Sequence, residues 1–519
     1  MAPSNAIVGD QLSPSWSEEG VEVGRFVVAI DQGTTSTKTM IVDAEGMIVA
    51  FATAALAPHF PQTGWVEHDP VAIWTSVLET MRAAMARAGI AAREVAAVGL
   101  TNQRETVVLW DRRTGEPVYN AIVWQDRRTT GRCEELERDG AGPRVRALTG
   151  LRIDPYFSAT KIAWILDHVP GLRRRAERGE ICAGTVDSWL LWQMSGGRAH
   201  VTEATNASRT LLMDLERVAW SDDMCQLFNV PPELLARIEP SESMFADVSS
   251  SWLGASVPVG AMLGDQQAAL LAQGCVAPGQ TKNTYGTGSF VLQHTGTSAV
   301  TQAGSLVATA ACTGPGADQH YALEGSIFVT GAAIQWLRDG LGIIEHAHES
   351  ASLAESLADN GDVWFVPALT GLGAPWWDPH ARGTILGVTR GTTRAHLARA
   401  ALESIAYQTR DVVDEMNIHA GHDLGELRVD GGATQNHWLM QFQADILGVP
   451  VVVARSVEAT ALGAAYAAGV SVGLWRDHDG LPFDHRASAR YEPAMGADER
   501  ETLYRRWTCA LERSREWAL

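Results

Sequence analysis

Lysine, cysteine and long apolar runs are scarce in this sequence, and each shortage excludes a class of protein. Only three of the 41 basic residues are lysines, Lys38, Lys161 and Lys282, and 61 acidic residues leave a formal net charge of −20. Because nucleic-acid backbones are bound through clustered cations, this balance excludes a nucleic-acid partner. Any anionic substrate must therefore be held by local hydrogen-bond donors.

The cysteines and the apolar segments indicate a soluble protein of a reducing compartment. The six cysteines are scattered, without a C-x-x-C pair or the spacing of a disulfide framework, so we expect a cytoplasmic location. One uncharged run, at 459–475, is long enough to raise the question of a membrane span, but it consists largely of Ala and Gly rather than Leu and Ile. We predict a tightly packed helix there, with no membrane insertion. Residues 1–24 lack the pattern of a leader peptide, which predicts a flexible N-terminal extension.

The length of the chain predicts two domains. A chain of 519 residues is too long for one ordinary hydrophobic core, and 46% hydrophobic with 20% charged residues is typical of a globular protein. We therefore expect a cleft between two domains. A stretch at 274–279 begins and ends with glycine near the middle of the chain. We place the boundary there, with an N-terminal domain at 25–273 and a C-terminal domain at 274–519.

Local patterns predict alternating strands and helices with an internal repeat. The pair Asp69-Pro70 supplies an N-cap and a first-turn proline for a helix that runs to about residue 87. A pattern of strand, tight turn and strand near residue 30 returns in weaker form near residue 285, which suggests a duplicated core. The alternation predicts an α/β fold. The remaining expected elements are strands at 26–30, 39–42, 95–100, 280–285, 290–293 and 427–429, and helices at 396–416 and 437–447.

Three glycine-containing turns have the composition of phosphate-binding or ligand-contacting loops. The first, DQGTTS at 31–36, offers backbone N–H groups and three hydroxyls to phosphate oxygens, and Asp31 can hold a hydrated Mg²⁺. The second, KNTYGTGS at 282–289, has the same ingredients, and the third, DGGA at 430–433, lies between a strand and a helix. The first turn lacks the second glycine of a Walker A loop, so a different phosphate-binding fold is required. Taken singly, each turn is equally well explained as a simple connection.

One carboxylate is the candidate general base. Asp265, in GDQQ at 264–267, lies between an apolar stretch and a helical run. Open α/β sheets bind their ligands beyond the carboxyl ends of their strands, which is where a base is expected. The alternative interpretation of Asp265 is a helix N-cap.

A second group of residues suits the recognition of a polyol. Arg104 and Glu105, in NQRET at 102–106, follow a strand and can donate to and accept from neighbouring hydroxyls. Trp124, Tyr156 and Phe290 are candidates for apolar walls. The alternative interpretation is a surface ion pair and three core aromatic residues.

Taken together, these stretches resemble the FGGY family of carbohydrate kinases over about residues 27–473. The resemblance is carried by the motifs already quoted and by GWVEHDP at 64–70, DPYF at 154–157, GLGAP at 371–375 and LRVDGGA at 427–433. It implies a two-domain α/β fold of the actin/hexokinase/Hsp70-like (ribonuclease H-like) ATPase type, with the active site in the cleft between the domains. It also implies ATP as phosphoryl donor, Mg²⁺ as metal and glycerol as acceptor, in the first step of glycerol utilisation. A homodimer or homotetramer is a further implication.

The resemblance assigns roles to individual residues. On the acceptor side it implies that Asp265 is the general base and that the glycerol hydroxyls and carbon chain are bound by Arg104, Glu105, Trp124, Tyr156, Asp265, Gln266 and Phe290. On the nucleotide side it implies ATP contacts from Thr34, Thr35, Ser36, Lys38, Thr287, Gly331, Gln335, Gly432 and Asn436. At Lys38 many relatives have an arginine, so this chain keeps the charge but lacks the planar guanidinium fork. Asp31, and Asp265 through water, would hold the metal.

The chain departs from the family in a region that regulates some members. Some bacterial relatives bind fructose 1,6-bisphosphate with a basic loop shortly before the GDQQ motif, but here no Lys or Arg occurs between Arg237 and Lys282. Other relatives are activated by phosphorylation of a histidine in that region, but none occurs between His200 and His294. We therefore predict that neither form of regulation operates.

Three other functions remain open at this point. Another FGGY kinase, for a pentulose or a longer polyol, is the nearest alternative, although pentulose kinases usually carry a QMHG-like stretch in place of NQRE at 102–105. A nucleotide switch of the Hsp70 or actin type would use similar phosphate turns and would hydrolyse ATP without a polyol. A catalytically silent binding protein is the third alternative, although Asp31 and Asp265 are both present.

Overall fold

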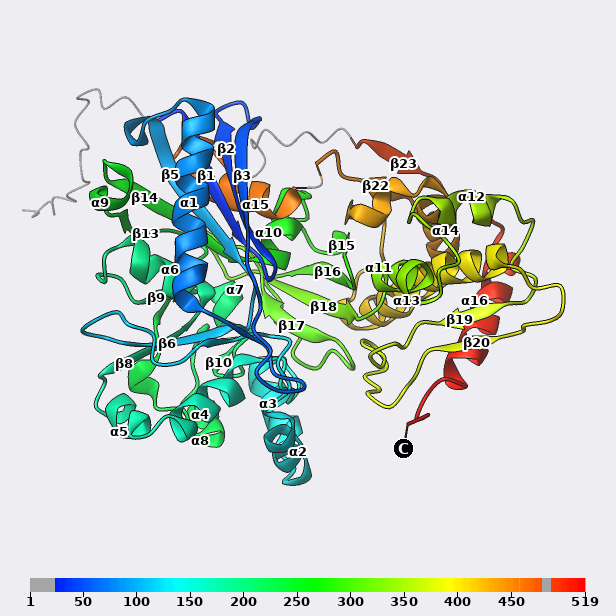
Figure 1. The fold of residues 1–519 in the computed structure, drawn as a ribbon, viewed down its shortest axis with the longest axis horizontal. Helices are drawn as coiled ribbons and strands as arrows, with labels where there is room; N and C mark the ends of the chain where they lie inside the picture. Colours follow the sequence, from blue (N-terminus) through cyan, green and yellow to red (C-terminus); the bar gives the residue numbers. More distant parts are fainter. Residues whose placement is uncertain (1–23, 457, 478–486, 519) are drawn as a thin grey trace, which may run out of the picture.

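The computed structural model describes residues 24–456, 458–477 and 487–518, and the polypeptide forms two lobes that each contain a large β-sheet (Figure 1). The first lobe lies on the left of the view and the second on the right. The extension predicted at 1–24 lies, apart from Gly24, outside the described residues. None of the described helices is both long and apolar enough to cross a membrane.

The first lobe is built on a mixed sheet of six strands in the order β13-β14-β5-β1-β2-β3. Strands β1, β2 and β3 form an antiparallel meander, β5 and β14 run parallel to β1, and β13 is an antiparallel edge strand. This connectivity places the carboxyl ends of three neighbouring parallel strands at one edge of the sheet. The strands are β1 (Phe26–Gln32), β2 (Ser36–Asp43), β3 (Ile48–Ala55), β5 (Val95–Asn102), β13 (Glu242–Val248) and β14 (Val257–Gly264).

Both faces of the first sheet are covered because its central strands are apolar on both sides. Side chains alternate between faces along a strand, so Val28 and Ile30 pack toward α1 (Pro70–Ala88), while Val27 and Ala29 pack toward α15 (Ala459–Ser471). Helix α1 begins as expected, since Asp69 accepts a hydrogen bond from the Val71 amide at 2.8 Å. It ends at Gly89, whose φ of 70° is the left-handed conformation that favours glycine.

The second lobe repeats the order of the first sheet. Its seven strands follow β17-β18-β16-β15-β21-β22-β23, with an antiparallel β15-β16-β18 meander and β21 and β22 parallel to β15. The predicted duplication is confirmed by this topology, in which the long helix α13 (Arg394–Ala420) takes the place of α1 in the chain order. The strands are β15 (Thr281–Tyr285), β16 (Ser289–Gly296), β17 (Val307–Ala310), β18 (Tyr321–Ile327), β21 (Leu427–Gly431), β22 (Val451–Val453) and β23 (Ala489–Tyr491).

Two helices that pack against each other link the lobes. Helix α10 (Asp265–Ala272) follows β14 and contacts β15 and β16, whereas α15 follows β22 and packs on the first sheet. A Cβ atom at Gly463 of α15 would lie 1.9 Å from the carbonyl oxygen of Ala268, so only glycine permits this approach. The prediction of a tightly packed helix in the uncharged run is confirmed for 459–471.

The rest of the first lobe is a smaller unit below the six-stranded sheet (Figure 1), centred on a four-stranded sheet in the order β4-β7-β6-β8. The strands of this sheet are β4 (Glu67–His68), β6 (Val107–Asp111), β7 (Ala121–Ile122) and β8 (Ile181–Thr185). Two further pairs of strands are β9 (Val201–Glu203) with β12 (Arg237–Glu239), and β10 (Met213–Asp214) with β11 (Ala219–Trp220). The remaining helices of the lobe are α2 (Thr130–Arg138), α3 (Gly142–Thr149), α4 (Ser158–His168), α5 (Leu172–Glu177), α6 (Val186–Met194), α7 (Ala204–Ala207), α8 (Asp222–Phe228) and α9 (Ser250–Leu253).

In the second lobe, helices pack around the seven-stranded sheet and a small hairpin. The helices other than α13 are α11 (Gly331–Gln335), α12 (Glu349–Glu355), α14 (His437–Leu447) and α16 (Ala497–Glu512), and the hairpin strands are β19 (Trp364–Val366) and β20 (Thr384–Leu386). All strands and helices expected from the sequence appear, with ends that differ by a few residues at most.

Candidate active site

The candidate base lies where two parallel strands end side by side. Asp265 is the first residue of α10, directly after β14, and Arg104 follows β5, which pairs with β14 in parallel register. The Arg104 Nε lies 3.0 Å from the Asp265 Oδ1. The capping position of α10 is Gly264 rather than Asp265, so the N-cap interpretation of Asp265 is wrong. The structure therefore brings the predicted base and the predicted polyol-binding arginine into direct contact.

Arg104 belongs to a buried network of charges that joins the two lobes. Its Nη1 donates to the Glu324 Oε2 at 2.6 Å, and its Nη2 donates to the Glu324 Oε1 at 3.3 Å. Arg209 donates from Nη2 to the same Glu324 Oε1 at 3.0 Å and from Nε to the Glu105 Oε1 at 2.6 Å. The two guanidinium groups hold the pKa of the fully buried Glu324 near 2, against the effect of desolvation.

Glu105 is held in an unusual conformation next to Arg104. Its φ of 61° lies in the left-handed region, which is strained for a residue with a long side chain. The Ser158 hydroxyl donates to its backbone oxygen at 3.1 Å, while Arg209 holds its carboxylate. Burial raises the pKa of Glu105, and the charges of Arg209 and Arg104 oppose that rise. The strain and the buried carboxylate are both typical of a functional position.

The three predicted aromatic walls surround this network. The rings of Trp124 and Tyr156 meet edge to face at 5.6 Å between centroids, and the Arg104 guanidinium lies 5.9 Å from the centre of the Phe290 ring. All three aromatic residues are partly exposed, so they line an accessible surface and are not core residues. Arg104 and Glu105 are buried at 3% and 1% exposure, which excludes a surface ion pair. Both alternatives for these groups are therefore wrong.

The first predicted phosphate turn connects β1 and β2. The Gly33 amide donates to the Ser36 carbonyl at 2.9 Å, and the Thr34 hydroxyl accepts from the Trp124 Nε1 at 2.9 Å. Desolvation and the negative charge of Asp265 raise the pKa of Asp31 to about 7, while Lys38 acts to lower it. Asp31 and Asp265 are therefore close enough for their charges to interact.

Lys38 is engaged by an acidic partner from the other end of the chain. Its Nζ lies 2.6 Å from the Glu458 Oε2, at the start of α15. The two side chains are 26% and 30% exposed, so the pair lies at a surface that solvent reaches. Any phosphate contact by Lys38 would have to compete with Glu458 for the ammonium group.

The second predicted phosphate turn connects β15 and β16. The Gly286 amide donates to the Gly288 carbonyl at 2.8 Å, and the Gly331 amide at the start of α11 donates to the Gly286 carbonyl at 3.1 Å. A Cβ atom at Gly288 would lie 2.3 Å from the Ile327 carbonyl oxygen, so the turn requires glycine there. Thr287 and Gly331, two predicted ATP contacts, are thus neighbours in the structure.

The predicted adenosine contacts lie at the ends of helices in the second lobe. Gln335 is exposed at the end of α11, and Gly432 is exposed after β21 with no atom within 4 Å of a Cβ built on it. The Asn436 Oδ1 accepts from the Leu439 amide at 3.0 Å and so caps α14. The backbone near Gly432 is therefore open to a flat ligand.

Comparison with known proteins identifies the family. The model of the N-terminal domain of the FGGY family of carbohydrate kinases matches residues 26–272, and that of the C-terminal domain matches residues 281–472. The chain belongs to the FGGY family of carbohydrate kinases. It is similar to the glycerol kinase of Dechloromonas aromatica, with 54% identity over 494 residues, 95% of this chain and 98% of the relative. It is also similar to glycerol kinase 2 of Thermotoga maritima, with 51% identity over 493 residues, 95% of this chain and 99% of the relative.

Solved structures of FGGY kinases share the fold. The crystal structure of Plasmodium falciparum glycerol kinase with ADP matches with a TM-score of 0.90 and 35% identity, over 94% of this chain and 98% of that one. A xylulose kinase from Lactobacillus acidophilus matches with a TM-score of 0.84 and 20% identity, over 94% of this chain and 97% of that one, which shows the fold alone. The predicted two-domain actin/hexokinase-like α/β fold and the predicted kinase class are confirmed.

Sequence reasoning missed several charged residues of this FGGY kinase. No role was predicted for Arg209, Glu324 or Lys282, yet all three are fully buried beside predicted site residues. A signal existed for Glu324, because an acidic residue within the otherwise uncharged strand β18 requires a buried cation. Arg209 lies in the turn directly after α7 and had no comparable local signal.

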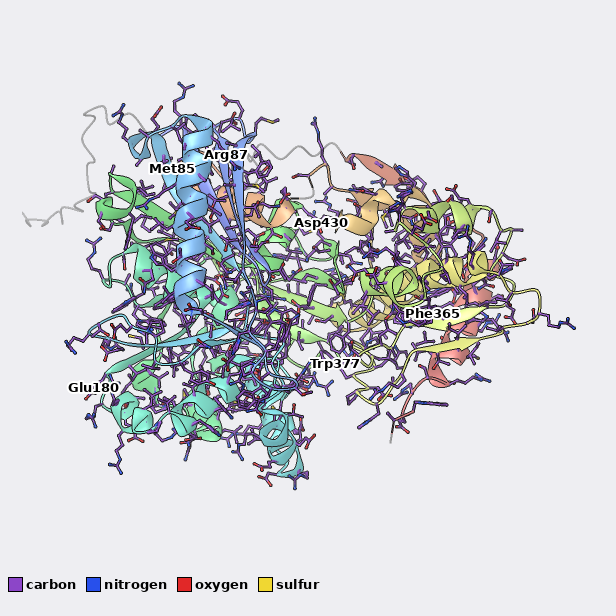
Figure 2. The ribbon with its side chains drawn as sticks, viewed as in Figure 1. Met85, Arg87, Glu180, Phe365, Trp377 and Asp430 are labelled. Atoms are coloured by element: carbon purple, nitrogen blue, oxygen red, sulfur yellow. The ribbon has the colours of Figure 1, made fainter. Side chains whose placement is uncertain are left out.

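Lys282 connects the lobes near the predicted polyol residues. Its Nζ donates to the Gln266 Oε1 at 2.5 Å and to the Thr284 hydroxyl at 2.9 Å, so the Gln266 side chain is turned toward Lys282. Desolvation lowers the pKa of Lys282 to about 8, and the charge of Asp430 acts in the opposite direction. Asp430 lies near the junction of the two lobes (Figure 2), where the Gln273 Nε2 donates to its Oδ2 at 2.8 Å.

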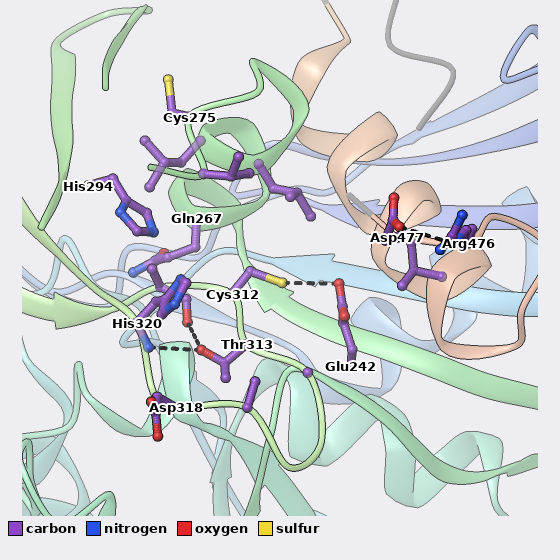
Figure 3. Close-up of a pocket in the computed structure, with 17 residues that line it drawn as sticks. Glu242, Gln267, Cys275, His294, Cys312, Thr313, Asp318, His320, Arg476 and Asp477 are labelled. Carbon is purple, nitrogen blue, oxygen red and sulfur yellow. Dashed lines mark hydrogen bonds and ion pairs between the residues drawn. The ribbon is translucent and has the colours of Figure 1, made fainter. Parts of the chain in front are cut away.

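A separate cavity lies on another side of α10 (Figure 3). It has a volume of about 450 Å³ and is lined by Gln267, Cys275, His294, Cys312 and His320, among others. None of the residues predicted from the sequence to bind substrate or ATP lines this cavity. Its connection to the candidate site is Gln267, whose Oε1 accepts from the Arg104 Nη1 at 3.3 Å.

Proposed function

We propose that this FGGY kinase transfers the γ-phosphoryl group of ATP to a terminal hydroxyl of glycerol, producing sn-glycerol 3-phosphate and ADP. The observation that carries the proposal is the contact of 3.0 Å between Arg104 and Asp265, beside Glu105. It combines a candidate base with a fixed donor and a fixed acceptor for hydroxyl groups. The similarity to glycerol kinases with identities of 54% and 51% supports the same acceptor.

The polyol is recognised by groups that are already in place before it binds. Arg104 can only donate hydrogen bonds and the ionised Glu105 can only accept them, so together they define the orientation of two neighbouring hydroxyls. Tyr156 supplies a further hydroxyl, with Gln266 close by, while Trp124 and Phe290 cover the carbon chain. Buried polar groups of this kind discriminate strongly against an acceptor that lacks a matching hydroxyl.

Proton removal and phosphate positioning together provide the catalysis. Asp265 accepts the proton of the terminal hydroxyl as its oxygen attacks the γ-phosphorus in line with the leaving oxygen. General base catalysis contributes about 10² to 10⁴ in rate, and alignment of the reactants contributes much of the remainder. The turns at 31–36 and 286–289 offer amides and hydroxyls to the phosphates, with Thr34, Thr35, Ser36 and Thr287 as the side-chain donors.

The carboxylates of the site fit a magnesium ion that arrives with the nucleotide. Desolvation and, after it, repulsion from Asp265 raise the pKa of Asp31, and a divalent cation would relieve that repulsion. Mg²⁺ commonly binds one or two carboxylates together with substrate phosphates and water. Among the described residues no group of three or more potential ligands forms a dedicated metal site, which matches that mode. When bound, the ion would neutralise charge on the transferred phosphate.

Several finer predictions are carried forward as parts of this proposal. The division into domains at 25–273 and 274–519, the cytoplasmic location and the homodimer or homotetramer stay predictions. The second candidate function is phosphorylation of another small polyol or a pentulose, but NQRE at 102–105 favours glycerol. A nucleotide switch is disfavoured because it has no use for the buried donor and acceptor pair.

An assay of ADP release tests the proposal. The purified protein is supplied with ATP and Mg²⁺ and, in turn, with glycerol, dihydroxyacetone, xylulose, ribulose or erythritol, and a reaction without acceptor is the control. We expect the highest kcat/KM with glycerol and little ADP release without an acceptor. A higher kcat/KM with a pentulose would support the second candidate, and equal ADP release without any acceptor would support a nucleotide switch.

A further inference from the structure

Glu324 is the centre of a chain of five charged side chains, of which all but the partly exposed Asp265 are buried. The chain runs from Asp265 through Arg104 to Glu324, and on through Arg209 to Glu105, with each link at 3.0 Å or less. Glu324 comes from β18 of the second sheet, whereas the other four residues come from segments of the first lobe. One residue of the second lobe therefore touches both arginines that hold the candidate polyol site.

Stability alone is a poor explanation for this arrangement. Removing a carboxylate and two guanidinium groups from water is costly, and buried ion pairs are often no more stabilising than apolar residues of the same volume. Glu324 and Arg209 are each 0% exposed, so desolvation applies in full. The Ser326 hydroxyl also donates to the Glu324 Oε1, at 3.3 Å. A charge that is buried at such a cost is expected to fix the geometry of a site.

The contacts define what Glu324 holds in place. Two bonds to Arg104 fix the plane of that guanidinium group, and this plane determines where its Nε meets Asp265. The bond to Arg209 orients a second guanidinium group, whose Nε then holds Glu105. The Arg209 guanidinium lies 5.4 Å from the centre of the Tyr156 ring, and its Nη1 has no hydrogen-bond partner among the described residues. Arg209 therefore contacts two of the predicted glycerol ligands.

We propose that Glu324 is a positioning residue for the polyol, which holds Arg104 and Arg209 and through them sets Asp265, Glu105 and Tyr156 in the geometry that accepts the substrate. This inference rests on the proposed function for the identity of the polyol. It assigns an essential part of acceptor recognition to the second lobe. The acceptor site is then complete only while β18 lies against the first lobe.

The test compares Glu324 with a matched buried glutamate elsewhere in the same lobe. Glu403 of α13 is 3% exposed, accepts from the Arg399 Nε at 2.8 Å and accepts from the Asn360 Nδ2 at 2.8 Å. It touches none of the predicted site residues in the hydrogen bonds that the structure describes. Glu324→Gln and Glu403→Gln thus each remove one buried negative charge and keep the shape of the side chain.

Steady-state kinetics with each substrate varied in turn give the main result. Because a hydrogen bond to a charged group is lost, we expect Glu324→Gln to raise the KM for glycerol by about 10-fold to 100-fold, and to leave the KM for ATP within about twofold. Glu403→Gln should leave the KM for glycerol within about twofold even if it lowers the Tm. An unchanged KM for glycerol in Glu324→Gln would overturn the proposal, as would equal increases in both variants.

Two further measurements keep the proposal falsifiable. The rise in Tm on adding a fixed concentration of glycerol without ATP should be smaller in Glu324→Gln than in wild type and unchanged in Glu403→Gln, and an unchanged rise in both would count against a positioning role. If Glu324→Gln does not fold, Glu324→Asp keeps the charge but shortens its reach, and should raise the KM for glycerol by a smaller factor. The acceptor assay on the wild-type protein comes first. If the wild type prefers another polyol, the proposed function is refuted. The Glu324→Gln and Glu403→Gln variants are then compared with that polyol, which still tests the positioning role.

Discussion

The proposed acceptor end and the proposed nucleotide end of the site are built from different kinds of chemical group. At the acceptor end, Arg104, Glu105, Arg209 and Glu324 are buried and already paired with one another. At the nucleotide end, the turns at 31–36 and 286–289 present glycine, hydroxyls and backbone amides, and much of this surface is exposed. A neutral polyol must be recognised by fixed donors and acceptors, whereas phosphates can be held by amides and a metal ion. The difference explains why a chain with three lysines and a charge of −20 can still bind an anionic cosubstrate.

The two duplicated sheets also differ, because a carboxylate and a hydroxyl occupy exchanged positions in them. In the first sheet Asp31 on β1 lies beside Thr101 on β5, and in the second Thr284 on β15 lies beside Asp430 on β21. Each lobe therefore offers one carboxylate and one hydroxyl at the same edge, but on exchanged strands. Asp31 is coupled to Asp265, whereas Asp430 is coupled to Lys282. The duplication preserves the backbone, while the local charges favour the proposed metal site in the first lobe.

The largest expected effect is the loss of the base at the acceptor end. Asp265→Asn should lower kcat by about 10² to 10⁴, because the amide cannot accept the hydroxyl proton. Binding of ATP should stay within about twofold of wild type, since the proposed direct contacts with the nucleotide come from other residues and Asp265 would reach the metal through water. Steady-state assays and calorimetric titration with a non-hydrolysable ATP analogue measure the two quantities. Near-normal turnover would remove the assignment of Asp265.

The second largest expected effect is a pH dependence of Mg²⁺ binding at the proposed nucleotide end. With a pKa of about 7, the Asp31 carboxyl is protonated below neutral pH and ionised above it, and only the ionised form binds Mg²⁺. At limiting Mg²⁺ we expect the apparent KM for Mg²⁺ to rise by about tenfold for each pH unit below 7. The KM for glycerol should change much less over the same range. Asp31→Asn should lose this dependence, and a variant that retains it would show that another group titrates.

The raised pKa of Asp31 also predicts how the free energy of unfolding changes with pH. The pKa of Asp31 is raised from 3.8 to about 7 in the folded protein, so the folded state binds the proton more tightly than the unfolded state. The free energy of unfolding of the metal-free protein therefore decreases as the pH rises from about 4 to about 7. Asp31→Asn should remove this part of the pH dependence.

The fold and half of the site follow from local sequence because local geometry decides them. Asp265 was predictable since it follows an apolar strand and begins a helix, and β5 and β14 then place it beside Arg104. The network around Glu324 was not predictable, because it joins residues 115 positions apart in sequence, such as Arg209 and Glu324. Such a pairing depends on how β18 packs against the first lobe, and a local sequence pattern does not predict that packing.

A smaller effect is expected at the residue that joins the two ends. Thr34 belongs to the first phosphate turn and accepts a hydrogen bond from the Trp124 Nε1, which comes from the acceptor wall. Thr34→Val removes that acceptor, and loss of a neutral hydrogen bond should raise the KM for both glycerol and ATP by about twofold to tenfold. Thr35→Val is the matched control, because the exposed Thr35 side chain has no such hydrogen bond among the described residues, and the substitution should affect ATP alone. If both variants changed only the KM for ATP, the two ends would be independent.

The smallest expected effect is the absence of a response to fructose 1,6-bisphosphate. The segment at 245–258, where the family resemblance places a basic loop in some members, forms the end of β13, the short helix α9 and the start of β14. It contains no Lys or Arg of its own, although Arg82 of α1 donates from Nη2 to the Trp252 carbonyl at 2.8 Å. One exposed arginine that already holds a carbonyl is a weak site for two phosphates. Activity should therefore stay constant on adding the bisphosphate at low micromolar concentration, and a response that Arg82→Ala abolished would show that an arginine from a neighbouring helix replaces the missing basic loop.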